Sequence, residues 1–173
     1  MAADYGRAGW PLDSVQAAKG WGQSPIATCE YGIPGPADTR PVFRGDGYRR
    51  GQGRVLAAYQ WVIDAGTTQE AEQVVTTVLR WPDGCDSRLG RAGLEDYVIT
   101  SKPPQRRTLA DGSLGYWYTT NIKNSRPDRV ELVAVVQRSE RVSLVVLHEN
   151  EPAGSLDAVN AAELLKRSYE RLG

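Results

Sequence analysis

The clearest signal in the chain is the alternation of hydrophobic and polar positions in its second half. Two valine-rich runs, residues 130–137 and 142–149, are joined by a polar turn near residues 138–140. This pattern predicts a β-hairpin. Because residues 130–137 are apolar on both faces, we expect this run to be a central strand of a sheet.

Other short runs with the same period predict further strands. Residues 54–64 carry apolar side chains on both faces, which also favours a position inside the sheet. Pro103 and Pro104 interrupt the chain after one predicted strand, and Asp111-Gly112 is a turn signal before the next. The remaining strands are expected at residues 26–31, 94–100 and 116–122.

A helical period begins after Thr67. Thr67 and Glu70 have the spacing of a capping box, in which the Thr67 side chain accepts from the Glu70 amide and the Glu70 carboxylate accepts from the Thr67 amide. Trp81 and Pro82 are expected to end this helix. Its buried stripe is predicted to be Ala71, Val74, Val75 and Val78.

Two more helices are expected near the ends of the chain. Residues 10–20 predict a short helix, and residues 156–172 predict a longer closing helix for which Ser155 is a candidate N-cap. The closing helix has an apolar stripe of Leu156, Val159, Leu164, Leu165, Tyr169 and Leu172.

The order of these elements predicts an α+β fold. We expect a mostly antiparallel sheet of about five to six strands, with two main helices and the short N-terminal helix packed on it. The length of 173 residues suits one domain, residues 1–173. Residues 32–53 are rich in glycine and proline and are interpreted as a long loop.

Charge and hydropathy exclude some partners. The formal net charge is zero, and nucleic-acid binding needs a concentrated positive surface, so we expect no nucleic-acid partner. The chain has no apolar run near the roughly 20 residues that span a bilayer. It also begins without the pattern of a signal peptide. A membrane is therefore expected to matter only through an anchor that is absent from this chain.

The two cysteines, Cys29 and Cys85, carry information about the compartment. They permit a single intramolecular disulfide. If it forms, the domain belongs outside the reducing cytoplasm. The alternative is a cytosolic protein with two buried free thiols.

Catalytic chemistry is not indicated by any motif. The single histidine, His148, follows apolar residues on one strand face, so we expect it at the edge of the core. One histidine without a Cys-x-x-Cys pair excludes the ordinary zinc patterns. We therefore predict no catalytic residues, no metal and no cofactor.

Aromatic residues with polar groups are frequent, with five tryptophans and eight tyrosines beside one phenylalanine. In a strand, Tyr116 and Tyr118 share one face and Trp117 takes the other. These side chains either cover the core or line a cleft for a sugar, lipid or peptide. The candidate ligand residues are Trp61, Tyr116, Trp117, Tyr118, Tyr48, Arg49 and Arg50.

Residues 54–172 resemble a known family in their order and pattern. A strand ending in Trp61-Val62-Ile63-Asp64-Ala65 leads into the helix that begins at Thr68, and Leu79-Arg80-Trp81-Pro82-Asp83-Gly84-Cys85 follows. This arrangement resembles the extracellular PknH-like sensor domain of actinobacterial membrane serine/threonine kinases and related lipoproteins. The resemblance implies an extracytoplasmic domain with a ligand cleft, and it implies no catalytic residues.

These observations favour a non-enzymatic, extracytoplasmic sensor-like domain that binds a small-molecule or cell-envelope ligand. Two alternatives stay open at this point. One is a small biosynthetic enzyme, cytoplasmic in location, that acts by shaping a pocket without metal or cofactor. The other is a protein–protein interaction or inhibitor module. Neither the ligand nor the oligomeric state follows from the residues.

Overall fold

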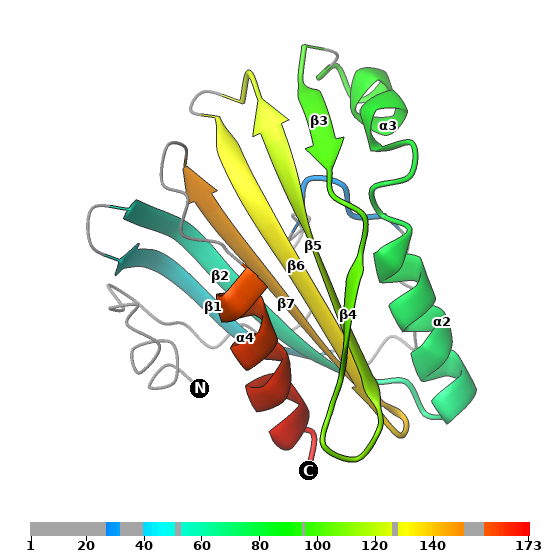
Figure 1. The fold of residues 1–173 in the computed structure, drawn as a ribbon. Coiled ribbons are helices and arrows are strands. Elements are labelled where there is room, and N and C mark those ends of the chain that lie inside the picture. Colours follow the sequence, from blue (N-terminus) through cyan, green and yellow to red (C-terminus); the bar gives the residue numbers. More distant parts are fainter. Residues whose placement is uncertain (1–26, 32–39, 51–52, 95, 126–127, 151–157) are drawn as a thin grey trace.

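A computed structural model describes residues 27–31, 40–50, 53–94, 96–125, 128–150 and 158–173, with backbone alone over residues 40–50, 53–59, 150 and 158–160. Its seven strands form one antiparallel sheet (Figure 1), which confirms the α+β class. The strand order is β1-β2-β7-β6-β5-β3, and β4 also pairs with β5. The strands are β1 (Arg40–Arg50), β2 (Gly53–Asp64), β3 (Val98–Ser101), β4 (Gln105–Thr108), β5 (Leu114–Lys123), β6 (Arg129–Arg138) and β7 (Arg141–Asn150).

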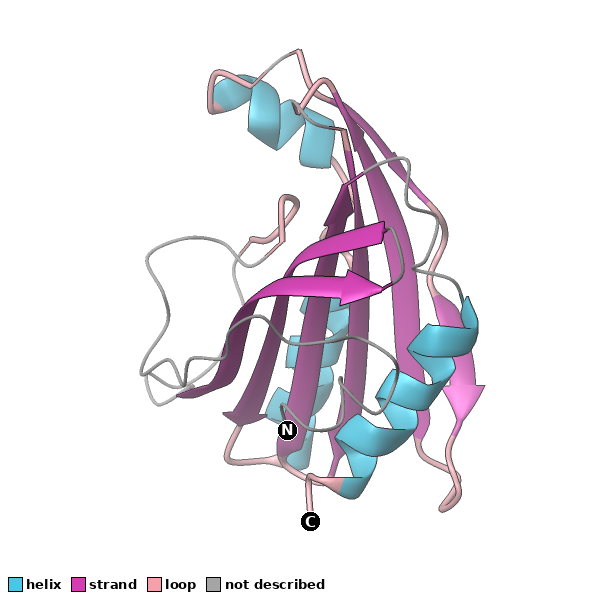
Figure 2. Cartoon of the chain, turned by 90° about the vertical axis from the view of Figure 1, so that its left-hand side faces the viewer, coloured by secondary structure: helices cyan, strands magenta, loops and turns pink. Residues whose placement is uncertain are grey.

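Helices cover both faces of the sheet. The described helices are α2 (Thr68–Leu79), α3 (Cys85–Arg91) and α4 (Ala158–Glu170). Alternate residues of β6 pack on opposite sides, because Val133 and Val135 belong to the core beneath α2 whereas Leu132 and Ala134 belong to the core beneath α4. Figure 2 shows these two helices on either side of the strands. The sheet is therefore the middle layer of three.

The β6–β7 hairpin lies at the centre of the sheet, as its pattern predicts. β6 pairs with β5 and β7, and β7 pairs with β2. Residues 132–136 and 142–147 are all buried. The apolar character of both faces follows from this central position, because helices cover the two sides. β2 lies between β1 and β7, which agrees with the interior position expected for residues 54–64.

Helix α2 confirms its predicted cap and stripe. The Thr67 side chain accepts a hydrogen bond from the Glu70 amide at 3.1 Å. The Thr67 hydroxyl donates to the Glu70 carboxylate at 2.9 Å, where the sequence predicted the Thr67 amide as the donor. The helix ends at Leu79 with Arg80 as its C-cap, and its buried residues are Ala71, Val74, Val75 and Val78.

Two expectations about the first third of the chain are wrong. Residues 40–50, part of the segment interpreted as a loop, form the edge strand β1. Pairing with β2 overrides the poor strand propensity of their glycines and proline, and an edge position tolerates such residues. Residues 27–31 form a turn rather than a strand, with the Glu30 amide bonded to the Ala27 carbonyl. The helix expected at residues 10–20 lies outside the described residues.

The region after Cys85 differs in detail from the prediction. The short helix α3 and the short strand β4 were not expected, and the strand predicted at residues 94–100 occupies only Val98–Ser101. Elements this short have too few residues to display a period. β4 is a strand because it pairs with β5, although all four of its residues are exposed.

Candidate functional site

Cys29 and Cys85 form the predicted disulfide, with 5.2 Å between their α-carbons. Cys29 belongs to the 27–31 segment, and Cys85 begins α3. Both cysteines are buried, and they pack in the core beneath α2. The bridge therefore fastens the 27–31 segment onto the α2 face of the sheet.

Arg88 and Trp81 also bind the 27–31 segment. The Arg88 guanidinium donates to the Cys29 carbonyl at 3.1 Å and lies 4.1 Å from the centre of the Tyr31 ring. The buried Trp81 indole donates to the Tyr31 carbonyl at 2.9 Å. These contacts and the disulfide hold the 27–31 segment in one position, over the end of the sheet where β6 begins.

Beneath this segment lies the buried carboxylate of Glu131. Its side chain accepts hydrogen bonds from the amide of Thr28, at 2.9 Å, and from the Thr28 hydroxyl. His148 Nδ1 lies 3.4 Å from the same carboxylate and Arg129 Nε lies 3.8 Å from it. Because Glu131 is only 1% exposed, these partners are what make its burial tolerable.

Glu131 is part of a polar row that crosses the sheet. The pairing registers place Ser101, Thr120, Glu131 and His148 side by side on β3, β5, β6 and β7. The Ser101 and Thr120 hydroxyls are 2.9 Å apart. Within the row Ser101 is bonded to Thr120 and His148 is paired with Glu131, and Thr28 of the 27–31 segment covers Glu131, so this region is a structural anchor rather than an open site.

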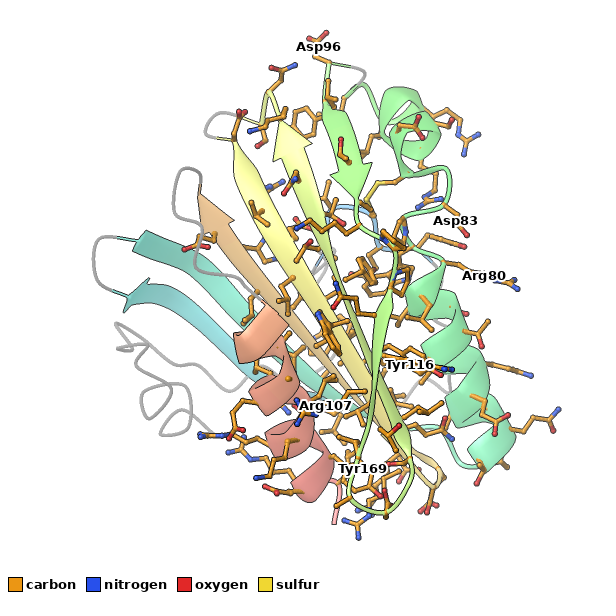
Figure 3. The ribbon with its side chains drawn as sticks, in the orientation of Figure 1. Arg80, Asp83, Asp96, Arg107, Tyr116 and Tyr169 are labelled. Carbon is orange, nitrogen blue, oxygen red and sulfur yellow. A yellow bond between two sulfur atoms is a disulfide. The ribbon has the colours of Figure 1, made fainter. Side chains whose placement is uncertain are left out.

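At the other end of the same face there is an open groove. It has a volume of about 620 Å³ and runs between α2 and the tips of the β4–β5 and β6–β7 hairpins. Figure 3 shows Tyr116 between β4 and α2, and Tyr169 lower down near the β4–β5 connection. The groove is lined by Glu72, Val75, Thr76 and Leu79 of α2, residues 111–114, Tyr116, residues 137–139, and Tyr169 of α4.

Three charged or polar side chains join the elements at the lower end of the groove. The Tyr169 hydroxyl donates to the Asp111 carboxylate, and the Arg138 guanidinium lies 5.1 Å from the centre of the Tyr169 ring. Asp111 also accepts from the Ser113 hydroxyl at 2.7 Å and from the Ser113 amide at 3.1 Å. These two hydrogen bonds hold the pKa of Asp111 below its ordinary value, so a negative charge is maintained at the groove wall.

Tyr116 and Tyr118 lie on the same sheet face but have different roles. Tyr118 is 2% exposed, and its hydroxyl donates to the Val78 carbonyl at 3.1 Å. Burial raises the pKa of Tyr118, so this hydroxyl stays protonated and remains a donor. Tyr116 is half-buried in the groove, and its hydroxyl makes no hydrogen bond with the described part of the chain. Tyr116 therefore offers a ligand a polar group that the described residues do not use.

The other candidate ligand residues do not gather in the groove. Trp61 is buried in the core beneath α2, and Trp117 packs against the core beneath α4 on the opposite face. Tyr48, Arg49 and Arg50 lie on β1, at the far edge of the sheet from β5, where only their backbone is described. Of the four candidate ligand residues whose side chains the structure describes, Tyr116 alone lines this groove.

The sequence reasoning missed Glu72, Asp111, Arg138 and Tyr169, which also line the groove. It identified both hairpin turns but did not place them together. The antiparallel pairing of β5 with β6 would have shown that the two turns are neighbours, because Gly115 near the start of β5 pairs with Val136 near the end of β6. This pairing brings the residues before β5 beside those after β6.

Within the described ranges, no group of three or more His, Cys, Asp or Glu side chains is arranged to hold a metal ion. Among the helices described, none combines the length and the apolar character needed to cross a membrane. Comparison of the chain with models of known protein families and with curated protein sequences finds no match.

Proposed function

We propose that this protein is a non-enzymatic ligand-binding domain of the sensor type, which works outside the cytoplasm and takes its ligand in the groove beside α2. The observation that carries this proposal is the groove itself. It is open to solvent, and it has an apolar floor and polar groups, such as the Tyr116 hydroxyl, that the described residues leave unused. Small-molecule sites commonly combine these features.

The disulfide supports the location. Cys29 and Cys85 are linked, and both are buried. Such bonds persist in oxidising compartments and are rare in the cytoplasm. A domain of the PknH-like sensor type, which residues 54–172 resemble, would also work in such a compartment.

A thermal-shift screen tests the binding proposal. The purified domain is mixed with cell-wall fragments, glycolipids and small metabolites, and its melting temperature is followed. Compounds that raise the melting temperature are then titrated against Tyr116→Phe, with Tyr97→Phe as the matched control outside the groove. We expect Tyr116→Phe to weaken binding by about fivefold, as for the loss of one hydrogen bond. If no compound shifts the melting temperature, or both variants bind like the wild type, the groove is not the ligand site.

Thiol counting tests the compartment separately. Protein isolated from its native host without reductant is denatured and reacted with a thiol reagent. Outside the cytoplasm we expect no free thiols, because Cys29 and Cys85 stay bridged. Two free thiols per chain would contradict the proposed location.

A further inference from the structure

The groove carries charges of both signs on different walls. Glu72 lies on the α2 wall, and its carboxylate makes no ion pair or hydrogen bond with the described part of the chain. Arg138 lies at the β6–β7 turn, where its described contact is the Tyr169 ring rather than a carboxylate. Neither of these two charges forms an ion pair with a described residue, although Arg138 contributes, after the two Ser113 hydrogen bonds, to the lowered pKa of Asp111 on the same wall.

Between these charges the floor of the groove is apolar. Val75 and Leu79 supply it from α2, and Leu114 supplies it from β5. Leu114 is 38% exposed, which makes it one of the few large apolar side chains of the described residues that reach solvent. An apolar group that covers this floor would remove the exposed area from water and stabilise the complex.

The two charges and the apolar floor favour some classes of ligand over others. A polyanion would meet Glu72 and Asp111, against the single cation of Arg138. A neutral ligand would cover Glu72 and Arg138 without pairing either charge, and that desolvation opposes binding. A ligand with one positive end, one negative end and an apolar side chain satisfies all three surfaces.

We infer that the groove binds a short peptide with free ends, its terminal carboxylate directed to Arg138, its terminal ammonium to Glu72, and an apolar side chain on the floor formed by Val75, Leu79 and Leu114. This inference rests on the proposed function, whose ligand class it narrows. The volume of about 620 Å³ lies within the range of sites that hold ligands of dipeptide to tripeptide size.

The test uses the dipeptide leucyl-leucine in four forms, titrated into the disulfide-bonded protein by calorimetry. The forms have both ends free, the amine acetylated, the carboxylate amidated, or both ends blocked. We expect each blocked end to weaken binding about tenfold, because each removes one charge-assisted contact. Equal affinity of the four forms would overturn the inference, and this comparison needs no variant protein.

Two variants test which protein side chain binds each end of the peptide. In Arg138→Gln the free acid and the amide should bind equally, and in Glu72→Gln the free amine and the acetylated form should bind equally. Arg106→Gln on β4 and Glu170→Gln on α4 are exposed controls outside the groove and should keep the wild-type preferences. Unchanged preferences in Arg138→Gln and Glu72→Gln would overturn the assignment.

The outcomes separate this inference from the proposed function. If no form of the dipeptide binds but a saccharide or lipid does, and Tyr116→Phe weakens that binding, the peptide inference fails while the ligand-binding function stands. If neither the dipeptides nor any compound of the wider screen binds in the groove, both fail.

Discussion

The face of the sheet beneath α2 has a polar region at each end, and the two are built differently. Near the start of β6, Glu131 is buried and bonded to Thr28 of the 27–31 segment. Near the end of β6, Tyr116 and Glu72 line an open groove, and neither side chain is bonded to the described residues. Strand geometry puts about 20 Å between Glu131 and Gln137. A closed polar region serves stability, and an open one is available to a ligand.

Removal of the disulfide should have the largest effect on stability. Cys29 and Cys85 are 56 residues apart in sequence, and in a loop-entropy treatment their replacement by alanine should lower the free energy of unfolding by about 4 kcal/mol. Urea unfolding of the double variant measures this loss. A loss below about 1 kcal/mol would contradict the loop-entropy estimate for this bridge.

Removal of the buried carboxylate should have the next largest effect. Glu131→Ala leaves Thr28, His148 and Arg129 without their shared partner, and we expect a loss of about 3 kcal/mol. The exposed Glu170→Ala on α4 should change stability by less than about 0.5 kcal/mol. Ligand binding in the groove should survive Glu131→Ala wherever the protein remains folded. If binding is lost while the circular dichroism spectrum is unchanged, the two regions are not independent.

The paired tyrosines allow the sharpest comparison. Tyr118→Phe removes a buried hydrogen bond to the Val78 carbonyl and should cost about 1 kcal/mol of stability without altering ligand affinity. Tyr116→Phe should cost less than about 0.5 kcal/mol, because its hydroxyl makes no described bond, and should weaken binding instead. Chemical unfolding and ligand titration of both variants give the two readouts. The opposite pattern would contradict the roles assigned to Tyr116 and Tyr118.

The smallest expected effect concerns pH. The hydrogen bonds from Ser113 hold the folded pKa of Asp111 below its ordinary value of 3.8. A depressed carboxylate pKa contributes stability above the unfolded pKa and loses that contribution as pH falls through the folded pKa. Thermal unfolding between about pH 5 and pH 2.5 should therefore show a steeper acid loss for the wild type than for Asp111→Asn. If the melting temperatures of the two proteins fall in parallel with pH, the Asp111 carboxylate does not contribute to stability.

The regular elements could be predicted because their signals are local. The stripe of α2 and the Thr67 cap depend on residues within two or three helical turns. The β6–β7 hairpin likewise needs only its own alternation and one turn. In contrast, β1 forms against its local preference, because pairing with β2 satisfies its backbone groups. The sequence predicts a strand at residues 26–31, where the structure has a turn over residues 27–31, because an apolar run of that length has no distinctive period.

The candidate site was less predictable than the fold. Aromatic content drew attention to Trp61 and Tyr118, whose side chains the structure buries in the core. The alternation of Tyr116, Trp117 and Tyr118 correctly separated the two faces but gave no sign of which tyrosine reaches a groove. That depends on how α2 lies over the sheet, since Tyr118 is bonded under α2 to the Val78 carbonyl whereas Tyr116 lies in the groove along the same helix.

The sequence by itself determined the α+β class, the central hairpin, the capped helix and the single possible disulfide, because each depends on periodicity, a short motif or a count of two cysteines. Only the tertiary structure decided that Glu131 is enclosed, that β1 is a strand, and that Glu72, Asp111, Arg138 and Tyr169 meet in one groove. These residues are far apart in the chain. Their proximity arises from the pairing of β5 with β6 and from the helices on each face, and such long-range contacts leave no pattern in a single sequence.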